Sequence, residues 1–320
     1  MAACAKGALM VVSDEDFINI WRELGGAKAV SKRLQMSERA VHTRRRSVEN
    51  RTGTVLSAIS GKVYVLPEAP GRIKIDTLNG IHIIGSDAHV WPGERTTAQR
   101  GFVKFVKELQ PVAVHFNGDI FDGARASRWP RIGWDKSPTV KEELEACQEF
   151  SQMVEDAGKN AKLYWQLGNH DARFETRLAA QSPEYEGIKG FALKDHFPRW
   201  NQCWSAWVND ELVIKHRYHN GIHAVYNNTL KSGKSVVTGH LHSLKVTPFT
   251  DYNGTRFGVD GGTLANPYGE QFAGYMEDNP RNWVAGFIVV TFHDGHMLEP
   301  EKASVWDENH MQFRGNIIEV

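Results

Sequence analysis

The sequence predicts an α/β fold with two mixed β-sheets, preceded by a small helical unit. After Gly80, short apolar runs alternate with helical stretches, and each run ends in a polar cluster. Two later runs, RFGVDGG and AGFIVVTFHDGHM, predict further strands with no helix between them. This favours a mixed, two-sheet architecture over a purely parallel sheet. Before about Gly53 the chain carries helix signals and no strand signals.

The first region is predicted to be a helix-turn-helix-like unit. Ser13 followed by three acids is a favourable helix start, with a capping hydroxyl and negative charge in the first turn. Gly25 and Gly26 interrupt the pattern. The apolar spacing that follows fits two short helices, and Ser37 is suited to cap the second. The arrangement resembles a helix-turn-helix with residues 37–50 as its recognition helix.

Basic residues dominate this unit from Lys28 to Arg51, where the only acids are Glu38 and Glu49. Such an excess suits contacts to phosphate groups. The alternatives are a solvated helical face or a hairpin used for self-association. The candidate nucleic-acid-binding residues are Arg39, Arg44, Arg45 and Arg46.

Composition is that of an ordinary globular protein. The chain has 320 residues, is 41% hydrophobic and 24% charged, and has a formal net charge of zero. No apolar run approaches the roughly 20 residues that a membrane span needs. Cys4, Cys147 and Cys203 are odd in number and widely spaced, which favours a reducing, cytoplasmic location and argues against a cysteine metal site. The predicted segments are a helical unit over 1–53, a β linking segment over 54–79 and the main domain over 80–320.

Five apolar runs of the main domain lead into clusters of carboxylate, imidazole and amide groups. IHII leads to GSDAH, PVAVHF to NGDIFDG, AKLYWQL to GNHDARFE, ELVIK to HRYHNG, and SVVT to GHLHS. Such side chains gather at the carboxyl ends of strands in α/β sheets. Without a thiolate, this ligand set suits Mn²⁺, Fe or Zn²⁺. Glycines are expected to allow the tight turns into these clusters, namely Gly85, Gly118, Gly168 and Gly239.

The series DAH, GDIFD, GNHD, a strand-end histidine and GHLH resembles the calcineurin-like metallophosphoesterases. Their pattern is D-x-H, G-D-x-x-D, G-N-H-[D/E], H and G-H-x-H, and the resemblance covers residues 80–292. It implies two mixed β-sheets sandwiched between helices, with a two-metal site at the strand ends. By this resemblance one metal is held by Asp87, His89 and His242, the other by Asn169, His216 and His240, and Asp119 bridges both. His170 matches the histidine that acts on the phosphoryl group, with Asp171 orienting it.

The fourth motif departs from the family. The family usually has His-Gly there, whereas this chain has KHRYHNG, with Arg217 after His216. The end of the ELVIK run favours His216 as the ligand, and His219 is either an alternative ligand or a donor to substrate. Asp122 is interpreted as support for ligand orientation, with direct ligation as the alternative.

These residue types suit the hydrolysis of a phosphate ester. Two divalent ions roughly 3.5–4 Å apart lower the pKa of a bridging water, neutralise the phosphate oxygens and hold the ester in line. Asp119 can bridge them through its two oxygens. His170 can donate to the developing charge or protonate the leaving oxygen, which contributes about 10²–10⁴-fold. The sequence therefore predicts a metal-dependent phosphoesterase that uses a metal-bridging hydroxide, with two divalent ions, Mn²⁺ favoured over Fe or Zn²⁺.

Two aromatic loops bear on the substrate. In residues 123–139, arginines interleave with tryptophans, which suits clamping a phosphodiester and stacking a base; the alternative is a lid that packs on the domain. The segment 266–283 is expected to wall the pocket. The candidate substrate-binding residues are Arg125, Arg128, Trp129, Arg131 and His219.

Three functions remain open from the sequence. The leading hypothesis is a phosphodiesterase, nuclease-like, that acts on DNA or RNA delivered by the N-terminal unit. The alternative enzyme is a phosphatase or phosphodiesterase for nucleotides or small esters, in which that unit mediates homo-oligomer formation. The third is a DNA-binding or scaffolding protein with an inactive phosphoesterase domain, against which the full ligand set argues.

Overall fold

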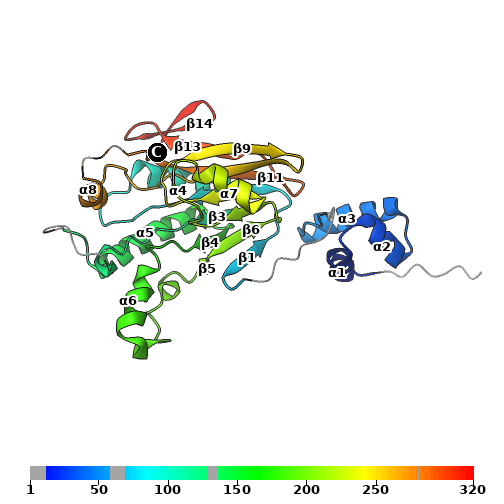
Figure 1. The fold of residues 1–320 in the computed structure, drawn as a ribbon, viewed down its shortest axis with the longest axis horizontal. Helices are drawn as coiled ribbons and strands as arrows, with labels where there is room; N and C mark the ends of the chain where they lie inside the picture. Colours follow the sequence, from blue (N-terminus) through cyan, green and yellow to red (C-terminus); the bar gives the residue numbers. More distant parts are fainter. Residues whose placement is uncertain (1–11, 58–68, 129–133, 135, 278, 280) are drawn as a thin grey trace, which may run out of the picture.

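The computed structural model describes residues 12–57, 69–128, 134, 136–277, 279 and 281–320 of the chain. Two β-sheets pack face to face with helices on their outer faces, and three N-terminal helices form a separate body at one end (Figure 1). This confirms the predicted fold class. Within these ranges, no helix combines the length and apolarity needed to cross a membrane.

The first sheet has the strand order β1-β6-β7-β8-β10-β9. Its strands are β1 Arg72–Ile75, β6 Ser205–Val208, β7 Leu212–Ile214, β8 Ser235–Thr238, β9 Lys245–Asp251 and β10 Gly254–Asp260. Strand β1 pairs in parallel with β6, and Ile75 is buried in the core between the sheets. Residues 72–75, placed in a linking segment from the sequence, are therefore an edge strand of the domain. The KVYVL stretch of the same predicted segment lies outside the described residues.

The second sheet has the order β15-β14-β13-β11-β2-β3-β4-β5, with β12 also paired to β11. Its strands are β2 Gly80–Gly85, β3 Ala113–Phe116, β4 Lys162–Gln166, β5 Asn201–Cys203, β11 Gly286–His293, β12 His296–Met297, β13 Glu301–Val305, β14 His310–Phe313 and β15 Asn316–Glu319. Strands β2 to β5 are parallel and β11 is antiparallel to β2, which makes the sheet mixed. No strand is predicted from sequence for β13 to β15, because these short runs mix polar and apolar residues.

Helices α4 (Thr97–Leu109) and α5 (Val140–Ala157) accompany the second sheet, and α7 (Ala224–Ser232) packs on the first. Each of α4 and α5 begins with a reciprocal capping box, in which a threonine and the third helical residue satisfy each other's free backbone N–H groups. Their apolar faces join the core around Phe116. The shorter helices are α6 Arg173–Gln181, α8 Glu270–Met276, η1 Ala124–Ala126, η2 Pro183–Tyr185 and η3 Leu193–His196.

Two histidines are buried on the neighbouring strands β2 and β3. His82 Nδ1 lies 3.0 Å from His115 Nε2, and His82 Nε2 lies 2.9 Å from the Thr77 hydroxyl. Burial lowers the pKa of His82 to about 3, so its ring stays neutral. The His82 ring is therefore a satisfied core group, whereas Nδ1 of His115 is buried and makes no hydrogen bond within the described residues.

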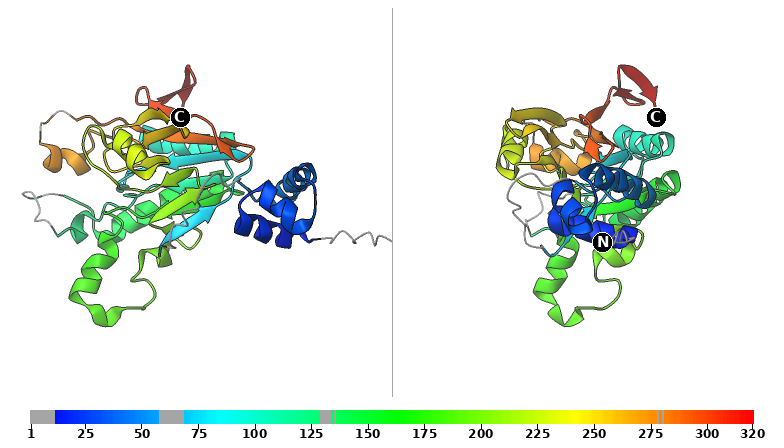
Figure 2. Two further views of the ribbon diagram at one scale, coloured as in Figure 1. Left: turned by 45° about the vertical axis from the view of Figure 1, so that its right-hand side comes forward. Right: turned by 90° about the vertical axis from the view of Figure 1, so that its right-hand side faces the viewer.

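The N-terminal body consists of α1 (Asp14–Leu24), α2 (Ala27–Leu34) and α3 (Glu38–Thr52), seen from two further directions in Figure 2. The Ser37 hydroxyl accepts the Ala40 backbone N–H at 3.2 Å and so caps α3, as its sequence position predicts. The helices enclose a core of their own, formed by Phe17, Trp21, Ala27, Val30, Leu34, Val41, Val48 and Leu56.

Candidate metal centre

The polar clusters that follow β2, β3, β4, β7 and β8 converge in space. Asp87 Oδ1 lies 3.1 Å from His242 Nε2, although the two residues are 155 positions apart. Asp119 Oδ2 lies 3.0 Å from His216 Nε2. Ligand atoms that lie within 4.8 Å of one another define three groups: Asp87, His89 and His242; His89, Asp122 and His170; Asp119, His216 and His240. These groups contain the aspartates and histidines predicted as ligands but not Asn169, and they include His216 rather than His219.

The backbone at these positions is unusual. Asp87, His89, Asp119, His240 and His242 all have positive φ angles, between 39° and 71°. This left-handed region is unfavourable for residues other than glycine, and such strain concentrates at functional sites. The surrounding fold therefore holds the chain in turns that direct these side chains to one locus.

Of the four motif glycines, only Gly118 has the left-handed backbone expected of a glycine that permits a tight turn. Gly118 does adopt a positive φ of 84°, but Gly85, Gly168 and Gly239 do not. A Cβ atom at Gly168 would overlap the Asp119 carboxylate, and one at Gly239 would overlap the Asp87 carboxylate. These glycines leave room for the acids of the site rather than permitting the turn.

Asp171 does not orient His170, contrary to the sequence interpretation. Its carboxylate is buried and accepts the backbone N–H groups of residues 119, 120, 121 and 168 at 2.7–3.0 Å, together with the Trp165 indole N–H at 3.0 Å. Asp171 therefore fixes the loop that carries Asp119. Adjacent side chains leave a turn in different directions, which is why the residue next to His170 faces away from it.

Asp122 is the carboxylate that contacts His170. Its Oδ1 lies 2.8 Å from Nδ1 of His170 and 3.1 Å from Nδ1 of His89, and its Oδ2 accepts the Trp91 indole N–H at 3.2 Å. Both rings thus turn their Nδ1 atoms to one buried acid, which leaves Nε2 of each ring for other partners. The predicted supporting role fits this geometry and extends to His170.

Arg173 is a residue of the site that sequence reasoning missed. Its Nη2 lies 3.0 Å from Nε2 of His170, and its Nη1 donates to the Asp122 carbonyl at 3.0 Å. The signal was available in GNHDAR, since a residue three positions after His170 returns to the same side of a helical turn.

The centre concentrates buried carboxylates that form no ion pair with a lysine or arginine among the described residues. Asp87, Asp119 and Asp122 are at most 7% exposed, and among the described residues their ion pairs are with histidines only. Burial acts to raise the pKa of Asp119, but the rings of His216 and His170 outweigh it and hold that pKa well below its usual value. Buried ionised carboxylates need a cation.

Several buried side-chain atoms that could ligate a metal have no hydrogen-bond partner among the described residues. His89 Nε2, Asn169 Oδ1 and His242 Nδ1 are buried and make no hydrogen bond within the described chain. Buried polar atoms are normally satisfied, so each exception calls for an explanation. Carboxylate, imidazole and amide groups with free lone pairs form the donor set that divalent metals take. The residues present therefore fit a metal centre.

Aromatic side chains from 266–283 border this centre, as expected from sequence. The Phe272 ring centroid lies 5.2 Å from that of His89, and the Trp283 centroid lies 4.3 Å from that of His242. The cavity that reaches His89, about 660 Å³, is lined in part by Trp91 and Gln271. The site is thus open to a small ligand on this side.

The predicted substrate-binding residues are only partly accounted for. The Arg125 guanidinium donates twice to the Ser137 carbonyl, at 2.7 and 3.0 Å, which fixes its own loop. Arg128 is exposed, and Trp129 and Arg131 lie outside the described residues. The backbone N–H of His219 donates to Asn228, and its ring packs on Tyr218.

The four candidate arginines of α3 divide into two kinds. Arg44 pairs with Asp14 at 2.6 Å, and Arg45 lies 3.4 Å from Glu49 and over the Trp21 ring. These two contribute to the stability of the unit, contrary to their predicted role. Arg39 and Arg46 are exposed.

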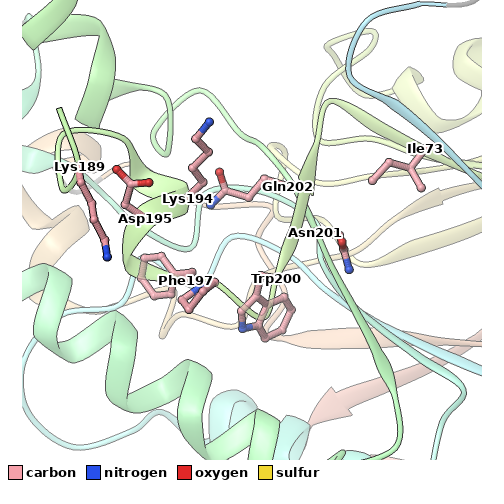
Figure 3. A pocket seen from close by; sticks show the side chains of 9 residues that line it. Ile73, Lys189, Lys194, Asp195, Phe197, Trp200, Asn201 and Gln202 are labelled. Atoms are coloured by element: carbon pink, nitrogen blue, oxygen red, sulfur yellow. The ribbon is translucent and has the colours of Figure 1, made fainter. Parts of the chain in front are cut away.

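A further cavity, of about 570 Å³, lies beside β1 and β5, one edge strand of each sheet (Figure 3). Ile73, Trp200 and Gln202 line it, with Lys189 and Lys194 at its rim. None of the residues predicted for the site contributes to it, so it is distinct from the metal centre.

The chain is similar to a known protein family, to phage proteins and to solved structures. Residues 81–257 match the calcineurin-like phosphoesterase family. The gene 54 proteins of Mycobacterium phages L5 and D29 are 24% and 22% identical, each over 68% of this chain and 91% of their own length. Similar solved structures include Vps29 from Entamoeba histolytica with zinc (11% identity, 75% of this chain, 98% of that chain, TM-score 0.39) and the phosphoesterase YfcE from E. coli (12%, 74%, 96%, 0.31).

Proposed function

Because the chain belongs to the calcineurin-like phosphoesterase family, we propose that it is a metal-dependent phosphodiesterase that acts on nucleic acid. Family membership supports metal-dependent hydrolysis of a phosphate ester. The nucleic-acid substrate rests on one observation, which is that a helix with an exposed basic face is joined to the phosphoesterase domain in one chain.

The metal ligands proposed are those predicted from the motifs. One ion is assigned to Asp87, His89 and His242, the other to Asn169, His216 and His240, with Asp119 shared between them. When bound, two such ions supply an activated water near neutral pH and neutralise the phosphate oxygens. Mn²⁺ is favoured, with Fe or Zn²⁺ as alternatives, because the donors are oxygen and nitrogen atoms.

His170 and Arg173 are proposed to act on the phosphoryl group from beside the metals. Asp122 holds His170 through Nδ1, so Nε2 is the atom that can serve the leaving oxygen. Burial acts to lower the pKa of His170, but Asp119 and Asp122 outweigh it and raise that pKa, which favours a ring able to donate a proton. Arg173 donates to Nε2 of His170, which favours the form of the ring in which Nε2 carries no proton. A phosphate oxygen that attracts the guanidinium would free Nε2 for proton transfer.

The exposed face of α3 is proposed to bind the nucleic-acid backbone. Arg39, His42, Thr43, Arg46 and Asn50 are exposed and recur at three- and four-residue spacing, which places them on one side of the helix. A recognition helix uses such a face, with arginines for phosphates or base edges and an amide for adenine. Lys28, Lys32 and Arg33 of α2 add exposed positive charge.

The test is a cleavage assay with Mn²⁺ on single-stranded DNA, double-stranded DNA and RNA, beside bis(p-nitrophenyl) phosphate and p-nitrophenyl phosphate. The proposal expects cleavage of a nucleic acid and of the aryl diester. Turnover of the aryl diester without cleavage of any nucleic acid would remove the nucleic-acid substrate and leave the phosphodiesterase. A protein that hydrolyses neither ester with Mn²⁺, Fe²⁺ or Zn²⁺ would contradict the enzyme assignment.

A second candidate is a phosphatase or phosphodiesterase for nucleotides or small esters, with the N-terminal unit used for oligomerisation. The cavity of about 660 Å³ at His89 favours it, since that volume suits a small ligand. The same assay separates the two functions, and sedimentation of the full chain against residues 69–320 tests the oligomer.

A further inference from the structure

We propose that Tyr268, Phe272, Arg281 and Trp283 form a subsite for a nucleobase and its phosphate beside the candidate metal centre. The subsite deepens the proposed function, because it names the part of a nucleic acid or nucleotide that would lie against His242. Its members come from the segment between β10 and β11, in which Phe272 belongs to α8, and this segment lies outside the family's sequence motifs.

Two of the aromatic members, Trp283 and Phe272, lie against histidines assigned to the metals. Trp283 meets His242 edge-on, with ring centroids 4.3 Å apart at an interplanar angle of 61°. Phe272 lies between Trp283 at 5.0 Å and His89 at 5.2 Å. A ligand stacked on Trp283 would therefore lie beside His242 and close to a phosphate held at the centre.

Among the described residues, Arg281 has no acidic side chain paired with it. Its guanidinium carbon lies 5.4 Å from the Trp283 ring centroid and 5.6 Å from that of Tyr268. Its Nη1 atom is buried and makes no hydrogen bond within the part of the chain that the structure describes. A guanidinium has only donors, so a buried unsatisfied N–H points to an acceptor that the described residues do not provide. A phosphate oxygen meets this need.

Tyr268 and Trp283 are more exposed than core aromatic residues, whereas Phe272 is buried. Tyr268 is 83% exposed, and Trp283 is only partly buried. Core aromatic rings of this protein, such as Trp165, are fully buried. Exposed rings flanking an arginine offer the flat face and the cation by which proteins hold a stacked base with its phosphate.

The test measures binding of two probes to the full-length protein loaded with Mn²⁺. Adenosine 5′-monophosphate and ribose 5-phosphate share a phosphate and a sugar, so their ratio of affinities isolates the base. Calorimetry gives both constants, with phosphate release followed so that binding and turnover are separated. The wild type should prefer the adenosine probe on the order of tenfold.

The variants distinguish stacking from phosphate contact. Trp283→Ala should bring the ratio near one while leaving ribose 5-phosphate binding unchanged, and Trp283→Phe should keep most of the preference. Arg281→Ala should weaken both probes. Tyr268→Ala should lower the ratio, whereas Tyr252→Ala, a fully exposed tyrosine on the β9–β10 turn, should not.

Two results would overturn the subsite: equal affinities for the two probes in the wild type, or a Trp283→Ala protein that loses both probes equally, as expected if the indole only supports His242. Failure of the proposed function looks different. In that case DNA and RNA remain uncut while the preference for the adenosine probe persists.

Discussion

The N-terminal unit and the metal centre differ in the partners of their buried and partly buried charged side chains. In the unit, Arg44 is matched by Asp14 and Arg45 by Glu49, so the partly buried cations have acids of their own. In the metal centre, Asp87 and Asp119 are buried with histidines only. The partly buried arginines of the unit thus have acidic partners, whereas the buried carboxylates of the centre have no lysine or arginine paired with them in the described chain.

This difference separates residues that stabilise from residues that bind. A paired charge inside a small helical body holds the helices together and has little left for a ligand. In the described chain, the buried carboxylates of the centre have no lysine or arginine paired with them. Histidine and amide atoms without hydrogen-bond partners lie in the same centre, so it fits a site that takes divalent ions. The same criterion selects Arg39 and Arg46 over Arg44 and Arg45 as binding candidates.

The largest effect should come from removing a shared acid of the centre. Asp119→Asn should lower Mn²⁺ affinity by more than the roughly 10- to 100-fold typical of an outer-shell change and should abolish hydrolysis of bis(p-nitrophenyl) phosphate. Calorimetric Mn²⁺ titration and the assay check it. Asp307→Asn, at an exposed pair with His310, is the control. Parental metal binding in Asp119→Asn would contradict the assignment of the centre.

The next prediction compares the effects of replacing Asp122 and Asp171 on kcat and on stability. Asp122→Asn should lower kcat on the order of a hundredfold with little change in stability, because it loosens His170. Asp171→Asn should lower the free energy of unfolding by several times the roughly 1 kcal/mol of one hydrogen bond, because its carboxylate accepts from five N–H groups. Urea unfolding and kcat measure the two. A stable Asp171→Asn protein with low kcat would restore the sequence interpretation.

A third prediction concerns Glu143, a buried acid behind Asp122. Its Oε1 accepts the Gly123 N–H at 2.5 Å, while burial and the Asp122 charge raise its pKa to about 8. A carboxyl whose pKa is higher in the folded than in the unfolded state contributes stability at low pH that is lost as pH rises toward 8. Glu143→Gln removes this loss. Urea unfolding at pH 5, 7 and 9 should show Glu143→Gln gaining on the wild type with pH, and a constant difference would contradict the argument.

The smallest effects should separate the arginines of α3. Arg44→Ala should cost about 1 kcal/mol of stability, since its pair with Asp14 is partly exposed. The double variant Arg39→Ala/Arg46→Ala should keep its stability but bind DNA more weakly, with a salt dependence reduced by about two charges. Fluorescence anisotropy over a salt series and thermal unfolding measure both. Equal DNA binding by the double variant and the wild type would remove α3 from the interface.

The order of elements and the strand-end clusters could be predicted from the sequence because both are local. Apolar period and length indicated β2, β3, β4, β7 and β8, and the helices α4 and α5 between them. The strand β1 was assigned to a linking segment, because only its pairing with β6, about 130 residues later, makes it part of the sheet. The strands β13 to β15 depend likewise on neighbours that are distant or irregular.

The sequence by itself determined which chemistry the chain carries, since carboxylates, imidazoles and an amide at the ends of five apolar runs leave few alternatives. Tertiary structure alone decided which neighbour each group faces: Asp122 rather than Asp171 at His170, acids at Arg44 and Arg45, and Trp283 at His242. The reason is geometric. The direction in which a side chain leaves a turn depends on backbone angles, and its partner depends on segments brought close only when the two sheets pack together.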